Sequence, residues 1–83
     1  MKVQVKIFPA AGLCDQKQEF EIVLNKGNFA ELETRLEERF GINPLPIESL
    51  IFLHNGRGLD GRRENVTFQD GDLLWLLPQI SGG

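Results

Sequence analysis

Two segments near the start of the chain alternate polar and apolar residues strictly. Residues 2–7 do so, and residues 19–24 repeat the pattern. A period of two residues is that of a strand with one buried face. The segment between them contains Pro9 and Gly12 and has no such period, which predicts a loop. Together they predict an antiparallel hairpin with a charged edge. The side chains expected to point inward are Val3, Val5, Ile7, Phe20, Ile22 and Leu24.

Residues 29–40 place apolar side chains at spacings of three and four, the period of a helix with one buried face. Asn28 precedes them, and its side-chain oxygen can accept a hydrogen bond from a free amide of the first turn. Gly41 follows and suits the left-handed residue that commonly ends a helix. We therefore predict a helix of about three turns. Its buried face consists of Phe29, Leu32, Leu36 and Phe40.

Two further apolar runs predict the rest of a sheet. Residues 49–54 form a short run that ends at an Asn-Gly pair suited to a tight hairpin turn. Residues 57–65 lack a clear period and predict a loop that holds at most a short strand. Residues 73–77 form the last run, and Pro78 is expected to stop sheet pairing. The predicted order of elements is hairpin, helix, strand, loop and strand. This is the order of the α+β β-grasp fold, in which a mixed sheet wraps around one helix and the first and last strands are parallel.

The 83 residues suffice for one domain with one modest core. We expect this domain to span residues 1–77 and residues 78–83 to form a flexible tail. Nine lysines and arginines against twelve aspartates and glutamates give a formal charge of −3, the wrong sign for a protein that binds nucleic acid. No apolar run approaches the roughly 20 residues of a membrane-spanning helix. A single cysteine and a polar N-terminal segment predict a cytoplasmic protein.

Few side chains of this sequence are suited to catalysis. His54 is the only histidine, which excludes a histidine pair or a histidine metal cluster, and we interpret it as a strand-end residue with a polar tip. Cys14 has no base or cation beside it and is interpreted as structural or incidental. Glu33 and Glu37 lie one turn apart on the helix, where a solvated face explains them more simply than an acid/base pair.

An arginine-containing loop is one candidate binding feature. Arg57, Arg62 and Arg63 form the only basic cluster of an acidic sequence. Guanidinium groups suit carboxylates and phosphates, which they bind in a two-pronged geometry. A contact with another protein is one interpretation of this cluster, and the solubility of a surface loop is the other.

The open face of the predicted sheet is a second candidate. Phe8 should point outward, and so should Leu73, Trp75 and Leu77 if the residues between them face the helix. Large apolar groups that are exposed together mark a protein interface. The opposite register of the last strand would instead bury Trp75.

The pair Gly82-Gly83 at the end of the sequence is the sharpest feature. Two residues without a Cβ make a thin, flexible terminus that can enter a narrow channel and present a carboxylate to a bound reactant. On its own such a pair can be frayed coil or an expression remnant. Here it follows a β-grasp pattern without a linker or tag, which makes an accident less plausible.

The chain resembles the ubiquitin-like sulfur carriers of the MoaD/ThiS type, most closely the small subunit of molybdopterin synthase. The resemblance covers nearly the whole chain and rests on residues 3–8, on Asp70-Gly71-Asp72 with the apolar strand that follows, and on residues 78–83. In that family an activating enzyme adenylates the terminal carboxylate with ATP, and a sulfur donor converts it to a thiocarboxylate. The large synthase subunit then receives the tail.

For this sequence the resemblance implies a carrier that is not itself an enzyme and that binds no cofactor or metal. Gly83 would bear the sulfur, and Gly82 would give clearance in the channels of both partners. The expected partners are an adenylyltransferase related to ubiquitin-activating enzymes, through which ATP and a sulfur donor are supplied, and the large subunit of molybdopterin synthase. Neither nucleic acid nor a membrane is expected. The expected interface residues are Phe8, Arg57, Arg62, Arg63, Trp75, Leu77, Pro78 and Ile80.

Departures from the family pattern leave the recipient of the sulfur open. Leu77 stands where family members often carry an aromatic residue, and Gln79 stands where they often carry a second proline. Related carriers serve tungsten-cofactor, thiamin or cysteine synthesis. A second hypothesis is a ubiquitin-like modifier of lysines, although Ile80-Ser81 lacks the arginine that such modifiers carry before their glycines. A third is a β-grasp interaction module whose glycine end is incidental.

Overall fold

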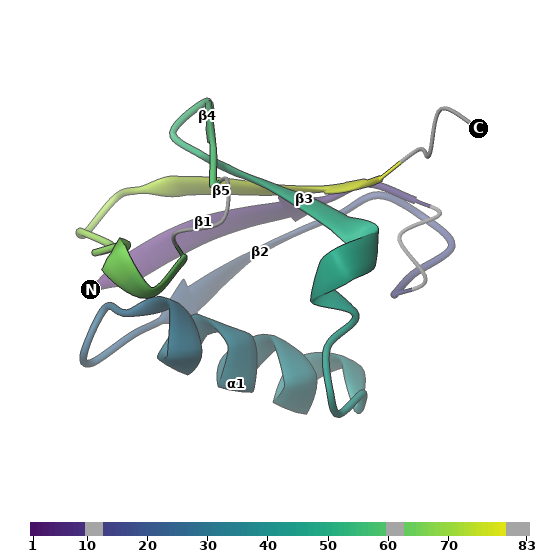
Figure 1. Cartoon of the computed structure of the whole chain (residues 1–83), viewed down its shortest axis with the longest axis horizontal. Coiled ribbons are helices and arrows are strands. Elements are labelled where there is room, and N and C mark those ends of the chain that lie inside the picture. Colours follow the sequence, from purple (N-terminus) through teal and green to yellow (C-terminus); the bar gives the residue numbers. More distant parts are fainter. Residues whose placement is uncertain (10–12, 60–62, 80–83) are drawn as a thin grey trace.

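A five-stranded mixed sheet lies against one helix in the computed structural model of the chain (Figure 1), which describes residues 1–9, 13–59 and 63–79. The elements are β1 (Lys2–Ile7), β2 (Gln18–Val23), α1 (Phe29–Phe40), the 3₁₀ turn η1 (Ile47–Ser49), β3 (Leu50–His54), β4 (Arg57–Gly58), the 3₁₀ turn η2 (Arg63–Asn65) and β5 (Leu73–Pro78). The strand order is β2-β1-β5-β3-β4. The β-grasp fold predicted from the sequence is confirmed.

The sheet pairs its first and last strands in parallel. β1 is antiparallel to β2 and parallel to β5, which in turn is antiparallel to β3. Because β1 and β5 run in the same direction, both end at the same side of the molecule (Figure 1). There the Phe8 N–H donates a hydrogen bond of 3.0 Å to the carbonyl of Leu76. The predicted hairpin, the parallel pair and the short strand after the Asn-Gly turn are all confirmed.

The core lies between the sheet and α1, and alternate residues of the strands supply most of it. The buried apolar side chains are Val3, Val5, Ile7, Ile22, Leu24, Phe29, Leu32, Leu36, Leu45, Leu50, Phe52, Phe68, Leu74 and Leu76. Burial of one such side chain stabilises a fold by about 1.5–3 kcal/mol. Within the described ranges, no polar or charged side chain is buried. The one-sided patterns of the strands and the helix therefore account for the core.

Helix α1 begins and ends where the sequence predicts. The Asn28 side chain accepts a hydrogen bond of 2.9 Å from the Glu31 N–H, which satisfies one free amide of the first turn. Gly41 ends the helix in the left-handed region with φ of 67°, and its N–H donates to the carbonyl of Glu37. In the part of the chain that the structure describes, no helix is long and apolar enough to cross a membrane.

The prediction that Pro78 stops sheet pairing is wrong. Pro78 is the last residue of β5 and lies opposite Leu50 of β3. The next residue, Gln79, donates its N–H to the carbonyl of Ser49 at 2.9 Å. N–H groups alternate sides along a strand, so the missing N–H of Pro78 points to the side where β1 has already ended. The flexible tail predicted beyond this point stays a prediction, because residues 80–83 lie outside the described residues.

Candidate functional site

The face of the sheet opposite α1 carries a line of large apolar side chains. Leu73, Trp75 and Ile51 are 49%, 41% and 39% exposed, and Leu77 lies half-buried opposite Ile51 on the neighbouring strand. These residues face outward because Leu74 and Leu76 of the same strand are fully buried against the helix. The predicted register of the last strand is confirmed. We call this surface the apolar strip; its residues are Phe8, Ile51, Leu53, Leu73, Trp75 and Leu77.

Trp75 is the centre of the apolar strip. It lies between Lys6 of β1 and Leu53 of β3 in the strand register. The Phe8 ring packs edge-on against the indole, with 5.6 Å between ring centres. The Lys6 ammonium lies 5.0 Å from the centre of the indole and 5.4 Å from the centre of the Phe8 ring. The outward orientation predicted for Phe8 and Trp75 is therefore correct.

The same face becomes polar over β1 and β2. Lys6 forms an ion pair of 3.5 Å with Glu19, and the Gln4 amide donates a hydrogen bond of 2.7 Å to the Glu21 carboxylate. Both glutamates are exposed on β2, an edge strand of the sheet. The open face thus has an apolar half over β3 and β5 and a charged half over β1 and β2.

The apolar strip leads along β5 toward the end of the sequence. Pro78 is half-buried at the end of this strand, and Gln79 is tied to β3 by its bond to Ser49. The predicted site residues Ile80, Gly82 and Gly83 lie outside the described residues. In the sequence, the segment that contains Gly82 and Gly83 follows the strand that carries Trp75.

The predicted arginine cluster is described only in part. Arg57 is exposed on β4, whereas Arg62 lies outside the described residues. Arg63 is half-buried, and its guanidinium lies 5.9 Å and 5.8 Å from the ring centres of Phe29 and Phe52. This contact with the aromatic pair of the core was not predicted. A role of these arginines in partner binding stays a prediction.

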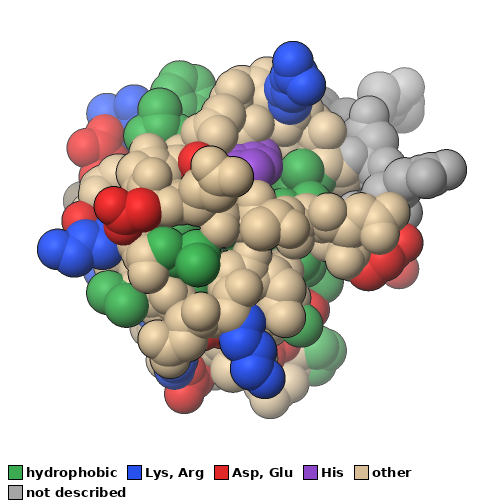
Figure 2. Space-filling model, turned by 90° about the vertical axis from the view of Figure 1, so that its left-hand side faces the viewer, with side chains coloured by type: hydrophobic (Ala, Val, Ile, Leu, Met, Phe, Trp, Pro, Cys, Tyr) green, Lys and Arg blue, Asp and Glu red, His purple; other side chains and the backbone are tan. Residues whose placement is uncertain are grey.

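His54 belongs to a polar network at the opposite end of β5 from Pro78. Its Nε2 lies 2.7 Å from Oδ2 of Asp72, whose carboxylate also accepts hydrogen bonds from the Asn55 side chain and the Gln69 N–H. Burial acts to raise the pKa of Asp72, but these hydrogen bonds outweigh it and hold the pKa below its ordinary value. Figure 2 looks onto this end, with the histidine in purple at the surface. The described residues contain no cluster of His, Cys, Asp and Glu that could hold a metal.

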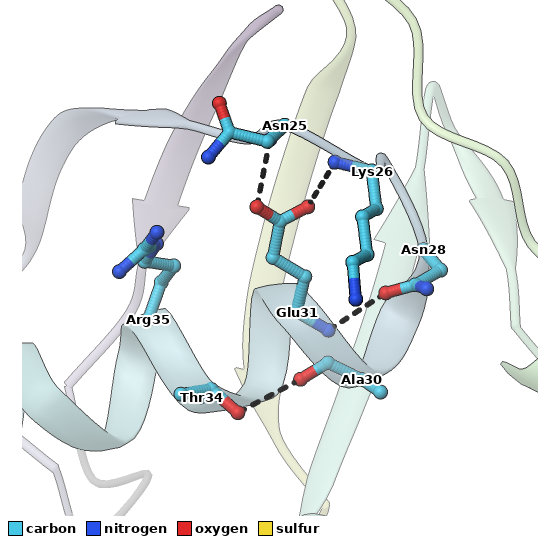
Figure 3. A pocket seen from close by; sticks show the side chains of 7 residues that line it. All are labelled: Asn25, Lys26, Asn28, Ala30, Glu31, Thr34 and Arg35. Carbon is cyan, nitrogen blue, oxygen red and sulfur yellow. Dashed lines mark hydrogen bonds between the residues drawn. The ribbon is translucent and has the colours of Figure 1, made fainter.

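A hollow of about 410 Å³ lies at the start of α1 (Figure 3), lined by Asn25, Lys26, Asn28, Ala30, Glu31, Thr34 and Arg35. The Glu31 carboxylate accepts hydrogen bonds of 2.7–2.9 Å from the N–H groups of Asn25, Lys26 and Gly27. The bond from Asn25 first, and then those from Gly27 and Lys26, hold the pKa of Glu31 below its ordinary value. The N–H groups of Asn25, Lys26, Gly27 and Glu31 are already occupied, so we interpret the hollow as structural.

Two of the residues considered for catalysis have structural contacts. Glu37 is half-buried, and its carboxylate accepts a hydrogen bond of 2.9 Å from the Leu45 N–H, so its assignment to a solvated helix face is wrong. It fastens the segment after α1 to the last turn of the helix. Cys14 is half-buried against the core, which fits its structural interpretation.

No family model matches the chain, but curated proteins resemble part of it. A curated relative from Drosophila yakuba, named molybdopterin synthase sulfur carrier subunit, is 35% identical over 54 residues, or 65% of this chain and 59% of the relative. The protein of the same name from Drosophila melanogaster is 34% identical over 53 residues, or 64% of this chain and 58% of the relative. Over this aligned part, the chain is similar to molybdopterin synthase sulfur carrier subunits. It spans less than two thirds of the length of these curated relatives.

Two solved structures superpose on the whole of this chain. A chain in the complex of subunits 1 and 2 of molybdopterin-converting factor from Helicobacter pylori superposes with a TM-score of 0.70 and 28% identity over the full length of both chains. SAMP1 from Haloferax volcanii superposes with a TM-score of 0.74 at 15% identity, a likeness that shows the ubiquitin-like fold alone. The resemblance to MoaD-type carriers predicted from the sequence is confirmed.

Proposed function

We propose that this chain is a sulfur carrier in the synthesis of molybdopterin, for a molybdenum or tungsten cofactor, and that the carboxylate of Gly83 carries the sulfur. The observation that supports this most directly is that an exposed aromatic surface and the glycine pair are joined by one strand. β5 bears the exposed Trp75 and is followed in the sequence by the segment with Gly82 and Gly83. A carrier needs both a surface by which partners hold it and a narrow end that reaches into them. Similarity to carrier subunits supports the same function.

The proposed chemistry has two steps. The Gly83 carboxylate is a poor electrophile, so it first attacks the α-phosphorus of ATP, which forms an acyl adenylate and releases pyrophosphate. A sulfide from a sulfur donor then attacks the carbonyl carbon, AMP leaves, and a thiocarboxylate remains. This chain supplies the reacting carboxylate, and the adenylyltransferase supplies ATP and the catalytic groups. We therefore propose a non-catalytic subunit without a bound cofactor.

The apolar strip is the proposed docking surface. An aromatic anchor near the centre of an interface contributes about 2 kcal/mol or more to binding, and Trp75 occupies that place here. The relative from Helicobacter pylori belongs to a two-subunit complex, which supports a large subunit as partner. The adenylyltransferase would use the same strip at another time, so the two complexes exclude each other. We propose the cytoplasm as their location.

The position of the terminal carboxylate tests this proposal. ATP–pyrophosphate exchange is measured with the cognate adenylyltransferase for the parent, for a variant that lacks Gly83 and for Gly82→Val. Deletion of one residue withdraws the carboxylate by about 3.5 Å along an extended chain, beyond the tolerance of an in-line attack. We expect exchange to be lost while the melting temperature stays at that of the parent. Normal exchange with the shortened chain would refute the proposal.

A further inference from the structure

Lys6 lies on the border between the apolar strip and the charged half of the open face. Its side chain is 27% exposed, and its ammonium lies 5.4 Å and 5.0 Å from the ring centres of Phe8 and Trp75. Its ion-pair partner within the described ranges is Glu19, at 3.5 Å, longer than the roughly 2.7–2.9 Å of a strong ammonium–carboxylate hydrogen bond. The Glu19 side chain itself is 62% exposed and can rotate away into solvent. Lys6 is thus a partly exposed cation with a loosely held partner.

An ammonium group carries three N–H donors, and a carboxylate oxygen is a strong acceptor for them. The faces of aromatic rings attract the cation, but they lack the oxygen acceptors that its N–H groups need for strong hydrogen bonds. Among the described residues, no hydrogen bond of ordinary length is made by the Lys6 ammonium. Lys6 therefore retains the capacity to bind a stronger acceptor.

The space next to Lys6 can admit such an acceptor. A hollow of about 310 Å³ lies on the open face and is lined by Gln4, Val5, Lys6, Glu19, Leu73 and Trp75. Leu73 and Trp75 form an apolar wall that is continuous with the apolar strip, and Lys6 stands on the other side. A side chain with an apolar stem and a charged oxygen at its tip matches both walls.

We propose that this hollow receives an aspartate or glutamate of the protein that docks on the apolar strip. The incoming carboxylate replaces Glu19 as the ion-pair partner of Lys6. A small free anion is disfavoured, because Glu19 and Glu21 repel it and it gains nothing from the apolar wall. A docked protein gains the contacts of the strip as well. The inference rests on the proposed function only in taking the molybdopterin synthase large subunit as the docking protein.

Carbodiimide cross-linking tests the exchange of partners at Lys6. The reagent joins an amine to a carboxylate in direct contact with loss of water, and peptide mass spectrometry identifies both residues. In the free chain we expect a Lys6–Glu19 link. In the complex with the large subunit of the same organism we expect Lys6 to be linked to an aspartate or glutamate of that subunit. A Lys6–Glu19 link that persists at equal yield in the complex would overturn the inference.

Binding variants separate this inference from the proposed function. Lys6→Met keeps an apolar stem over Trp75, so we expect its affinity for the large subunit to fall about ten- to hundredfold, with a weaker dependence on salt. Glu19→Gln removes the competing carboxylate and should strengthen binding. If Lys6 served only to position Trp75, Glu19→Gln would loosen Lys6 and weaken binding instead. If Trp75→Ala weakens binding and Lys6→Met does not, the inference about Lys6 fails, but the proposed docking surface stands. If neither variant weakens binding, the inference and the proposed docking surface both fail.

Discussion

The Nε2 atom of His54, at the end of β3, lies 2.7 Å from the Oδ2 atom of Asp72, the residue before β5. Asn55 strengthens this junction between β3 and β5 through two hydrogen bonds of 2.8 Å with Leu73. Its side-chain oxygen accepts from the Leu73 N–H, and its backbone N–H donates to the Leu73 carbonyl. The junction fixes where β5 starts against β3. A slip of one residue would reverse the faces of the strand and bury Trp75. A polar contact at one end of the strand thus supports the apolar surface along it.

Removal of the Asp72 carboxylate should destabilise the fold. Asp72→Ala leaves the Gln69 N–H and the side chains of His54 and Asn55 without their acceptor. We expect a loss of about 1–3 kcal/mol in the free energy of unfolding, measured by urea denaturation. The control is Asp15→Asn, an exposed carboxylate between β1 and β2, which should change the free energy by no more than about 0.5 kcal/mol. Equal losses in the two variants would contradict the role of the junction.

The contribution of Asp72 should also depend on pH in a defined direction. Burial acts to raise the pKa of this carboxyl, but the hydrogen bonds from Gln69, His54 and Asn55 outweigh it, so the folded pKa lies below the unfolded value of about 3.9. The folded chain therefore binds the proton less readily than the unfolded chain. The stabilisation is complete above the unfolded pKa and is lost as the pH falls through the folded pKa. The difference in unfolding free energy between parent and Asp72→Asn should shrink as the pH falls below about 5; a constant difference would be evidence against this coupling.

Truncation of two adjacent residues of β5 should lower stability to different extents. Leu74 is fully buried, so Leu74→Ala should lower the free energy of unfolding by about 2–5 kcal/mol. Trp75 is 41% exposed, so Trp75→Ala should lower the free energy of unfolding less, although its packing against Phe8 is lost. Urea denaturation of both variants measures these losses. A greater loss for Trp75→Ala than for Leu74→Ala would contradict the register of β5.

The periodic spacing of apolar residues, which marks the buried face of each strand and of the helix, explains why much of the fold could be predicted from the sequence. The strict alternation in β1 and the apolar run of β5 determine which side chains face the helix, and so they also determine that Trp75 faces outward. The helix ends at Asn28 and Gly41 follow from the local chemistry of caps. The apolar half of the candidate site was therefore predictable.

Contacts between distant segments could not be predicted in this way. His54 and Asp72 are 18 residues apart, and nothing in either local pattern indicates that they meet. The helical pattern alone indicates that Glu37 is one of several solvated glutamates. Its hydrogen bond with the Leu45 N–H forms only because the segment after α1 folds back against the helix. Arg63 comes from a loop without a period, so its place over the rings of Phe29 and Phe52 depends on the tertiary fold. Pro78 stays in the sheet only because β1 ends before it.

The mass of the intact chain after reaction tests the central claim most directly. The protein is incubated with ATP, sulfide and its cognate adenylyltransferase, and fragment ions locate any change. We predict that one oxygen is exchanged for sulfur and that the change lies on Gly83. Lysine-linked conjugates to other proteins would instead support a ubiquitin-like modifier. An unchanged mass, under conditions in which the same enzyme converts a known carrier, would contradict the sulfur-carrier function.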